Sequence, residues 1–173
     1  MYELAKKSKK ASRVLRGLDN GTRKKMLLKL ADHLSSKTED VIAENRKDME
    51  FAEKSNLSQA LKDRLMLDKA RVESMVQGVR EIADQEDIVG GYSQEFKNEA
   101  GLTIKRQRIP LGVILMIFES RPNVVIDCAA LALKSSNSIP NENLGLKNIK
   151  ILEDNNFFVL LIQKYKSGLP NRM

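Results

Sequence analysis

Residues 110–134, which read PLGVILMIFESRPNVVIDCAALALK, decide the fold class of this chain. Residues 113–118 form an uninterrupted apolar run of strand length, and such a run is typical of a strand buried on both faces in a parallel sheet. The polar, proline-containing turn of residues 119–123 follows, and proline is tolerated there because the first turn of a helix does not use its missing N–H. Residues 124–133 are then apolar except for Asp127. The order of strand, turn and buried helix predicts the opening of a βαβ unit.

The residues before this stretch predict helices and a β-hairpin. Residues 3–86 repeat apolar positions at helical spacing with charged residues between them. Residues 92–109 alternate polar and apolar side chains around a four-residue turn, residues 98–101, that ends in glycine. We therefore expect an α/β fold in which amino-terminal helices lead into the start of a Rossmann-like parallel sheet. Its expected elements are helices over 3–86, a hairpin over 92–109, a strand over 112–118 and a helix over 123–135.

The last 36 residues differ in composition from the rest of the chain. Residues 138–173 contain six asparagines and no alanine, whereas residues 1–137 contain twelve alanines and six asparagines. No periodic pattern runs through this segment, and asparagine-rich stretches favour turns over packed elements. We interpret residues 138–173 as a divergent tail that does not form a domain.

Composition excludes several classes of protein. The 173 residues include one cysteine, Cys128, and one histidine, His33, so an internal disulfide framework is excluded and too few soft ligands remain for a zinc site. No apolar run approaches the ~20 residues of a transmembrane helix, and the basic amino terminus lacks the apolar core of a secretory signal. We expect a cytoplasmic protein with no metal site and no membrane partner.

The net charge of +7 is concentrated at the amino terminus. Residues 1–30 hold ten Lys or Arg and two acidic residues, a charge of +8, so the remainder carries −1. A basic amphipathic segment can bind nucleic acid, but Tyr2 is the only aromatic residue within it that could stack on a base. A solvated helix face is the preferred interpretation. A non-enzymatic basic helical module that binds nucleic acid or a protein partner is the alternative function.

The turn of residues 119–123 is where chemistry is expected. In an open α/β sheet, ligands bind at the carboxyl ends of the parallel strands, and this turn follows the predicted strand. The Asn123 carboxamide could donate a hydrogen bond to a developing oxyanion, which a carboxylate cannot do. Spacing alone leaves helix capping open as the other interpretation, because Ser, Pro and Asn are common before helices.

Three strings resemble the gamma-glutamyl phosphate reductase family, also called glutamate-5-semialdehyde dehydrogenase, of the aldehyde dehydrogenase superfamily. They are PLGVI at 110–114, IFESRPNV at 117–124 and DCAALALKSSN at 127–137. Upstream strings, such as Asp63-Arg64-Leu65, fit the family in order and spacing. The resemblance covers residues 1–137. It implies an incomplete aldehyde dehydrogenase-like fold whose residues 1–137 form the amino-terminal part of the NADP-binding domain.

The resemblance also implies an activity and roles for residues. The family reduces L-glutamyl 5-phosphate to L-glutamate 5-semialdehyde with NADPH in proline biosynthesis, through a cysteine thioester. The hairpin resembles the superfamily's oligomerisation arm, so the complete enzyme is expected to be a homo-oligomer that binds no nucleic acid. By position, Asn123 matches the asparagine that helps form the oxyanion hole in the superfamily. The segment beside the nicotinamide end of the cofactor corresponds to Ile117, Phe118, Glu119 and Ser120. Arg121 is a chemical candidate for binding an anionic group of the substrate or cofactor.

The nucleophile of the family has no counterpart in this chain. Cys128 lies in an apolar helix, where burial raises the pKa of a thiol and makes it a poor nucleophile. Ser136 stands where the family usually has glycine, and the resemblance ends at Asn137. We therefore expect the chain to be inactive by itself.

The abrupt end of the resemblance leads to a prediction about the coding DNA. The break falls inside a family string, after one strand and one helix, and a completed domain would instead end in an exposed linker. We expect residues 138–173 to arise from a shifted reading frame. Reading the other two frames just past the Asn137 codon should reveal Ile-Leu-Arg-Gly-Gly or a close variant.

Overall fold

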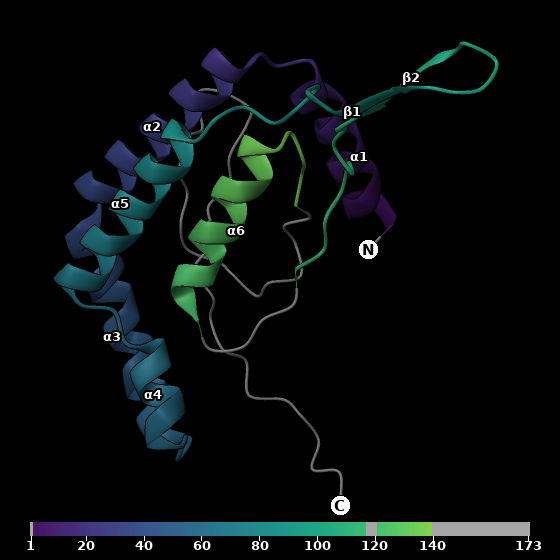
Figure 1. The fold of residues 1–173 in the computed structure, drawn as a ribbon. Helices are drawn as coiled ribbons and strands as arrows, with labels where there is room; N and C mark the ends of the chain where they lie inside the picture. Colours follow the sequence, from purple (N-terminus) through teal and green to yellow (C-terminus); the bar gives the residue numbers. More distant parts are fainter. Residues whose placement is uncertain (1, 117–120, 140–173) are drawn as a thin grey trace, which may run out of the picture.

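The structure is a computed structural model that describes residues 2–116 and 121–139 (Figure 1). It is mostly helical, with one two-stranded sheet. The five helices α1 to α5 lie in the region where helical spacing predicted helices, and the two strands lie in the region predicted to form a hairpin. The elements are α1 (Tyr2–Arg16), α2 (Asn20–Ser36), α3 (Thr38–Lys54), α4 (Gln59–Leu65), α5 (Lys69–Asp84), β1 (Tyr92–Lys97), β2 (Thr103–Gln107) and α6 (Pro122–Lys134).

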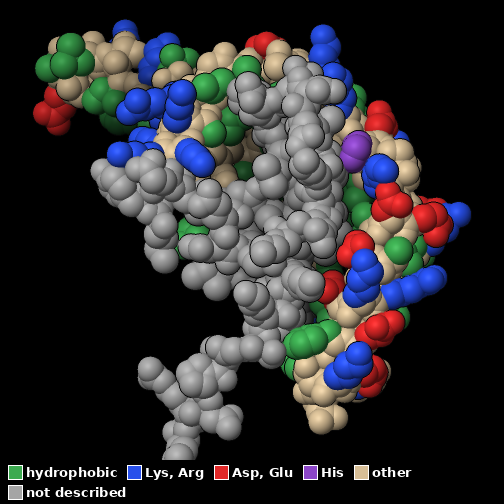
Figure 2. Space-filling view, turned by 180° about the vertical axis from the view of Figure 1, so that it is seen from behind, with side chains coloured by type: hydrophobic (Ala, Val, Ile, Leu, Met, Phe, Trp, Pro, Cys, Tyr) green, Lys and Arg blue, Asp and Glu red, His purple; other side chains and the backbone are tan. Residues whose placement is uncertain are grey.

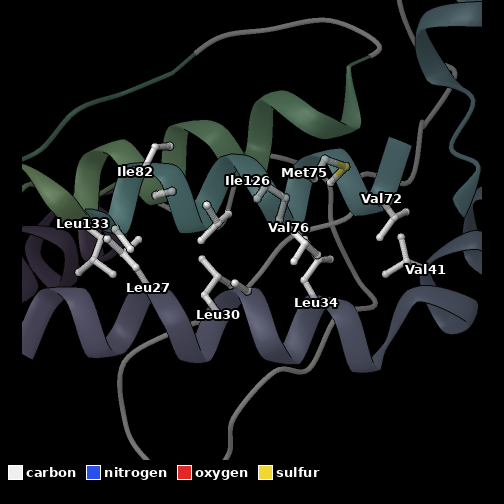
Figure 3. Close-up of a cluster of buried hydrophobic side chains, with 14 of the residues drawn as sticks. Leu27, Leu30, Leu34, Val41, Val72, Met75, Val76, Ile82, Ile126 and Leu133 are labelled. Atoms are coloured by element: carbon white, nitrogen blue, oxygen red, sulfur yellow. The ribbon is translucent and has the colours of Figure 1, made fainter. Parts of the chain in front are cut away.

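The core lies between α2, α5 and α6 (Figure 3). Each helix contributes apolar residues at spacings of three and four, which gather on one helix face. Leu27, Val72 and Val79 are fully buried. Because α6 packs against both α5 and α2, the core fixes where the amino-terminal end of α6 lies. The labelled core side chains include Leu27, Leu30 and Leu34 of α2, Val72, Met75, Val76 and Ile82 of α5, and Ile126 and Leu133 of α6.

A buried asparagine holds the turn between α4 and α5. The Asn45 side chain, from α3, donates to the Leu65 carbonyl at 2.9 Å and accepts from the Leu67 N–H at 2.7 Å. Asn45 is buried, so its side chain, in place of water, provides the hydrogen bonds that the Leu65 carbonyl and the Leu67 N–H need.

Replacing Asn45 by alanine should destabilise the protein. The change leaves the Leu65 carbonyl and the Leu67 N–H without their partner, so we expect a loss of about 2 kcal/mol in the free energy of unfolding. Urea denaturation followed by circular dichroism measures it. Glu50→Ala, at an exposed position of the same helix, should change stability by less than about 0.5 kcal/mol. An Asn45→Ala variant as stable as this control would contradict the assigned role.

The hairpin projects from the helices as an arm (Figure 1). Strands β1 and β2 pair antiparallel, with Phe96 opposite Ile104, and every residue of both strands is exposed. Gly101 takes a φ of 81° in the connecting turn, and its N–H donates to the Asn98 carbonyl at 2.9 Å. A two-stranded hairpin with solvent on both faces is only marginally stable by itself.

The predicted strand over 112–118 is represented by a single parallel bridge. Val113 bridges Ser138, the Ile114 N–H donates to the Ser138 carbonyl at 2.8 Å, and the Ser138 N–H donates to the Gly112 carbonyl at 2.8 Å. Residues 114–116 are not assigned to a strand, and residues 117–118 lie outside the described part of the chain.

The carboxyl-terminal end of α6 closes in a Schellman motif. The Asn137 N–H donates to the Ala132 carbonyl at 2.7 Å, and the Ser136 N–H donates to the Leu133 carbonyl at 3.1 Å. Ser136 takes the left-handed conformation, with a φ of 58°, at the position where such motifs favour glycine. The Ser138 hydroxyl donates to the Ser8 carbonyl at 2.8 Å and is buried, so the segment interpreted as a tail begins with a packed residue.

The conformation of Ser136 gives a testable difference between two variants. Ser136→Gly and Ser136→Ala both remove the hydroxyl, but only alanine keeps a Cβ in the left-handed region, which costs roughly 1–2 kcal/mol. We expect the glycine variant to be more stable than the alanine variant by about 1 kcal/mol. Paired thermal and urea denaturation measure the difference, and equal stabilities would argue against a positive φ at this position.

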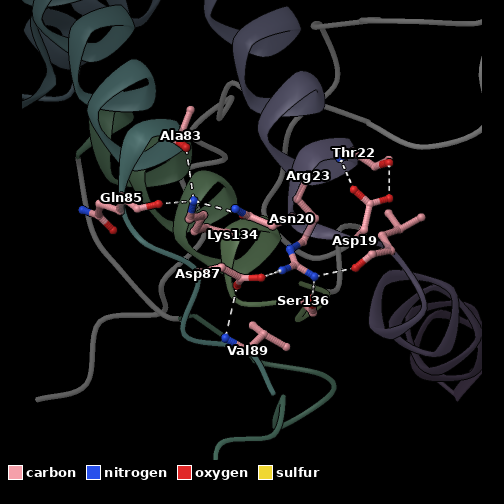
Figure 4. Close-up of polar contacts among 11 residues, drawn as sticks. Asp19, Asn20, Thr22, Arg23, Ala83, Gln85, Asp87, Val89, Lys134 and Ser136 are labelled. Carbon is pink, nitrogen blue, oxygen red and sulfur yellow. Dashed lines mark hydrogen bonds and ion pairs between the residues drawn. The ribbon is translucent and has the colours of Figure 1, made fainter. Parts of the chain in front are cut away.

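A buried arginine joins α2 to the end of α6 (Figure 4). Arg23 is 2% exposed, and its guanidinium forms an ion pair with Asp87 at 2.6 Å and donates to the Ser136 hydroxyl at 2.8 Å. The same group also donates to the Leu18 carbonyl. Asp87 in turn accepts from the Val89 N–H at 3.1 Å. This network attaches the segment after α5, which leads to the hairpin, to the helical core.

A buried lysine closes the same end of α6. Lys134 donates to the carbonyls of Ala83 and Gln85 at 3.1 and 2.6 Å and to the Asn20 side chain at 3.3 Å (Figure 4). Burial lowers the pKa of the Lys134 ammonium. The lysine therefore links the ends of three helices by hydrogen bonds to neutral groups.

The described surface mixes charges of both signs. Figure 2 shows Lys, Arg, Asp and Glu side chains interspersed along the helical side of that face. No helix within residues 2–116 and 121–139 combines the length and apolar character needed to cross a membrane.

Candidate functional site at the start of helix α6

The turn predicted to carry chemistry leads into α6. Of its candidate residues, Ile117, Phe118, Glu119 and Ser120 lie outside the described residues. Arg121 and Asn123 are described, at the amino-terminal end of α6, where Pro122 opens the helix. Both side chains are exposed, and neither caps the helix through its side chain. The capping interpretation of Asn123 therefore does not hold in this structure, because its side chain bonds elsewhere.

Arg121 and Asn123 line a cavity of about 420 Å³ between α6 and the α4–α5 turn. Asp127 lies one helical turn after Asn123 and lines the same space. Arg64 and Arg71 line its other side, from α4 and α5. The fold thus brings the predicted residues of α6 together with residues from far earlier in the sequence.

Asn123 and Asp127 form a polar pair inside this cavity. The Asn123 Nδ2 donates to the Asp127 carboxylate at 3.5 Å, across one turn of α6. Burial raises the pKa of the Asp127 carboxyl, and the hydrogen bond from Asn123 acts in the opposite direction. The contact is long, so the carboxamide N–H groups can donate to a ligand.

Three arginines give the cavity its positive character. Arg71 is already engaged: it donates to the Met66 carbonyl at 2.9 Å and pairs with the Asp63 carboxylate at 3.1 Å. The Arg64 and Arg121 guanidinium groups have no hydrogen bond or ion pair within the described part of the chain. Among the described residues, nothing competes with an anionic ligand for these two cations.

Sequence reasoning identified Arg121 and Asn123 but assigned no role to Arg64 or Arg71. Helical periodicity places the two arginines on polar helix faces, where arginine side chains are usually exposed to solvent and have no further role. The Asp63-Arg64-Leu65 string, noted only for its family resemblance, was the available signal. Only the packing of α6 against α5 shows that these residues share a cavity with Asn123.

Cys128, the only cysteine, is half-buried on α6. Burial raises the pKa of its thiol, and the neighbouring Asp127 charge raises it further. A thiol with a raised pKa forms little thiolate at neutral pH. This agrees with a packing role for Cys128.

Comparison with curated proteins identifies relatives that align with most of this chain. A gamma-glutamyl phosphate reductase from Francisella philomiragia is 46% identical over 157 residues, which cover 86% of this chain and 38% of that protein. One from Caldanaerobacter subterraneus is 37% identical over 174 residues, covering 96% of this chain and 40% of that protein. The chain is homologous to part of gamma-glutamyl phosphate reductase. It spans about two fifths of the length of these relatives.

Solved gamma-glutamyl phosphate reductases share the fold. The Thermotoga maritima structure matches 80% of this chain with a TM-score of 0.74 and 36% identity, and 33% of that structure is covered. The Saccharomyces cerevisiae structure matches 79% with a TM-score of 0.75 and 35% identity, and 35% of it is covered. These matches confirm the predicted α/β fold class. No model of a protein family matches the chain.

The extent of the alignments bears on the carboxyl-terminal segment. Residues 1–137 make up 79% of the 173 residues, and the solved gamma-glutamyl phosphate reductases match 80% and 79% of the chain. The Francisella and Caldanaerobacter alignments cover 86% and 96%, so both reach beyond Asn137. The gamma-glutamyl phosphate reductases of Sulfurihydrogenibium sp. and Geobacter metallireducens align over 79% of the chain, as expected for a resemblance that covers residues 1–137. The shifted reading frame stays a prediction.

Proposed function

We propose that this chain provides the amino-terminal part of an NADPH-dependent reductase that converts L-glutamyl 5-phosphate to L-glutamate 5-semialdehyde. The observation that carries the proposal is the cavity at the start of α6, where a segment homologous to gamma-glutamyl phosphate reductase presents Arg121 and Asn123. A ligand with several negative charges and a reacting carbonyl suits a cavity lined by guanidinium groups and a carboxamide donor.

Asn123 supplies the oxyanion donor in this proposal. The negative charge that develops on the carbonyl oxygen during acyl transfer requires a preorganised N–H. Asn123 lies in the first turn of a helix that the core fixes in place, so its backbone needs little reorganisation. Arg121, two residues earlier, binds a phosphate or carboxylate oxygen.

A nicotinamide cofactor would supply the hydride when bound. Ile117 to Ser120 would lie beside its nicotinamide end, and the adjacent Arg121 and Asn123 suit a ligand that carries phosphates and a carboxamide. Within residues 2–116 and 121–139, the glycines with positive φ are Gly90, Gly101 and Gly112, and none opens a helix. We therefore assign no phosphate-binding loop and route no step through the cofactor.

The cellular setting follows from the same proposal. The reductase acts in proline biosynthesis in the cytoplasm, on a small-molecule substrate and without nucleic acid. The complete enzyme is a homo-oligomer in which the hairpin arm, with Phe96 and Ile104 exposed, packs on a second copy. Nothing in the structure favours the alternative of a nucleic-acid-binding or partner-binding module.

A reconstituted enzyme tests the function. The chain alone, with only the Cys128 thiol, should not oxidise L-glutamate 5-semialdehyde with NADP and phosphate. A hybrid that joins residues 1–137 to the remainder of the Francisella philomiragia relative should do so, as followed by NADPH absorbance. NAD in place of NADP tests the cofactor. A folded hybrid without turnover, or turnover by the chain alone that Cys128→Ser abolishes, would overturn the proposal.

A further inference from the structure

The cavity at the start of α6 holds two groups that the proposed function does not use. One is Arg64, on the α4 side, and the other is the Asp127 carboxylate, one turn inside α6. We propose that Arg64 binds the α-carboxylate and Asp127 binds the α-ammonium of an L-glutamyl ligand. The inference rests on the proposed function and deepens it by naming which end of the ligand each side of the cavity recognises.

Arg64 is prepared for an anion by its surroundings. It is exposed at the carboxyl-terminal end of α4, and its guanidinium has no hydrogen bond or ion pair within residues 2–116 and 121–139. The turn that follows is held by Asn45 on one side and by Arg71 on the other. The two acids beside this turn already have partners, since Asp63 pairs with Arg71 at 3.1 Å and Asp68 accepts from the Arg71 N–H at 2.7 Å.

Asp127 is prepared for a cation by its lack of a close partner. Its one hydrogen bond in the described residues, from Asn123, is 3.5 Å long, beyond the usual range of about 2.7–3.2 Å. It forms no ion pair with any described residue, although it is partly removed from water. A partly buried carboxylate with one long hydrogen bond is under-compensated, and a ligand ammonium would supply the missing positive charge.

The two groups together match an α-amino acid. Such a head group carries a carboxylate and an ammonium on the same carbon. A site that recognises it therefore needs a cationic side chain for the carboxylate and an anionic side chain for the ammonium in one cavity. Guanidinium binds carboxylate through two parallel hydrogen bonds, which fixes its orientation. A volume of about 420 Å³ falls within the range of small-molecule sites. With its head group held there, the side chain of the ligand extends toward Arg121 and Asn123.

Three probes of graded chemistry test the inference on the full chain of 173 residues. L-Glutamate carries both head groups, glutarate lacks the ammonium, and 4-aminobutyrate lacks the α-carboxylate. Dissociation constants are measured by 15N NMR titration without cofactor. We expect L-glutamate to bind about tenfold more tightly than either analogue, a difference of about 1.4 kcal/mol. Equal binding of all three probes, or no binding of L-glutamate, would overturn the inference.

The variants separate the two contacts. Arg64→Gln should remove the preference for L-glutamate over 4-aminobutyrate and keep the preference over glutarate. Asp127→Asn should do the reverse. Arg46→Gln and Asp32→Asn change exposed residues outside the cavity and should alter neither preference. Amide spectra that retain their dispersion show that each variant is folded, and a folded Arg64 or Asp127 variant with unchanged preferences counts against the site.

This result is independent of the reductase activity. Binding of the three probes requires neither the cofactor nor the nucleophile that the hybrid supplies. If the hybrid is active but the three probes bind equally well, the proposed function is supported and the amino-acid site is contradicted. If the hybrid is inactive but the probes show the expected preferences, the amino-acid site is supported and the proposed reaction is contradicted.

Discussion

Replacing Arg23 by alanine is expected to lower the free energy of unfolding by about 3–5 kcal/mol. The guanidinium is almost completely buried, and its removal leaves the Asp87 carboxylate, the Ser136 hydroxyl and the Leu18 carbonyl without their partner. The penalty comes from these unpaired groups more than from the lost attraction. Urea denaturation followed by circular dichroism measures it.

Lys24→Ala is the matched control for this change. Lys24 is the next residue of α2 and pairs with Asp84 at 2.7 Å, but both side chains are largely exposed. Water and salt screen such a pair, so the control should lose less than about 1 kcal/mol. Adding 0.5 M salt should remove most of the small loss and little of the large one. Similar losses in both variants would show that Arg23 is not buried as the structure describes.

Replacing Asn123 by alanine in the hybrid enzyme is expected to lower kcat by about 10²–10³-fold. The carboxamide donor acts on the oxyanion of the transition state, so KM should change much less than kcat. Asn123→Asp should lose as much, because an ionised carboxylate accepts hydrogen bonds and cannot donate one. Initial rates of NADPH formation over a range of semialdehyde concentrations separate the two parameters.

Cys128→Ser provides the control for the active-site variant. The thiol is half-buried on the same helix and its pKa is raised by burial, so its replacement should leave kcat within about twofold. Circular dichroism of all variants excludes unfolding as the cause of a lost rate. Normal turnover with Asn123→Ala would show that another group stabilises the oxyanion.

Local patterns in the sequence predicted the elements but not all of their pairing. Helical spacing in residues 3–86 and alternation around Gly101 depend on neighbours in the chain, so they are visible without the fold. The continuous apolar run from Val113 predicted a buried strand, yet the described part shows one bridge to Ser138. A strand is defined by its partner, and pairing with residues 25 positions later cannot be derived from the run itself.

The string around Asn123 by itself predicted the similarity to gamma-glutamyl phosphate reductases, because a run of specific residues at fixed spacing carries more information than composition. It also made Asn123 the candidate oxyanion donor. The tertiary structure alone decided what surrounds that residue. Arg64 and Asp127 share a cavity because apolar stripes bury α5 against α6, and those stripes contain neither residue. Arg23 meets Ser136, 113 residues away, for the same reason. Long-range proximity is set by how helices pack, and no local pattern records it.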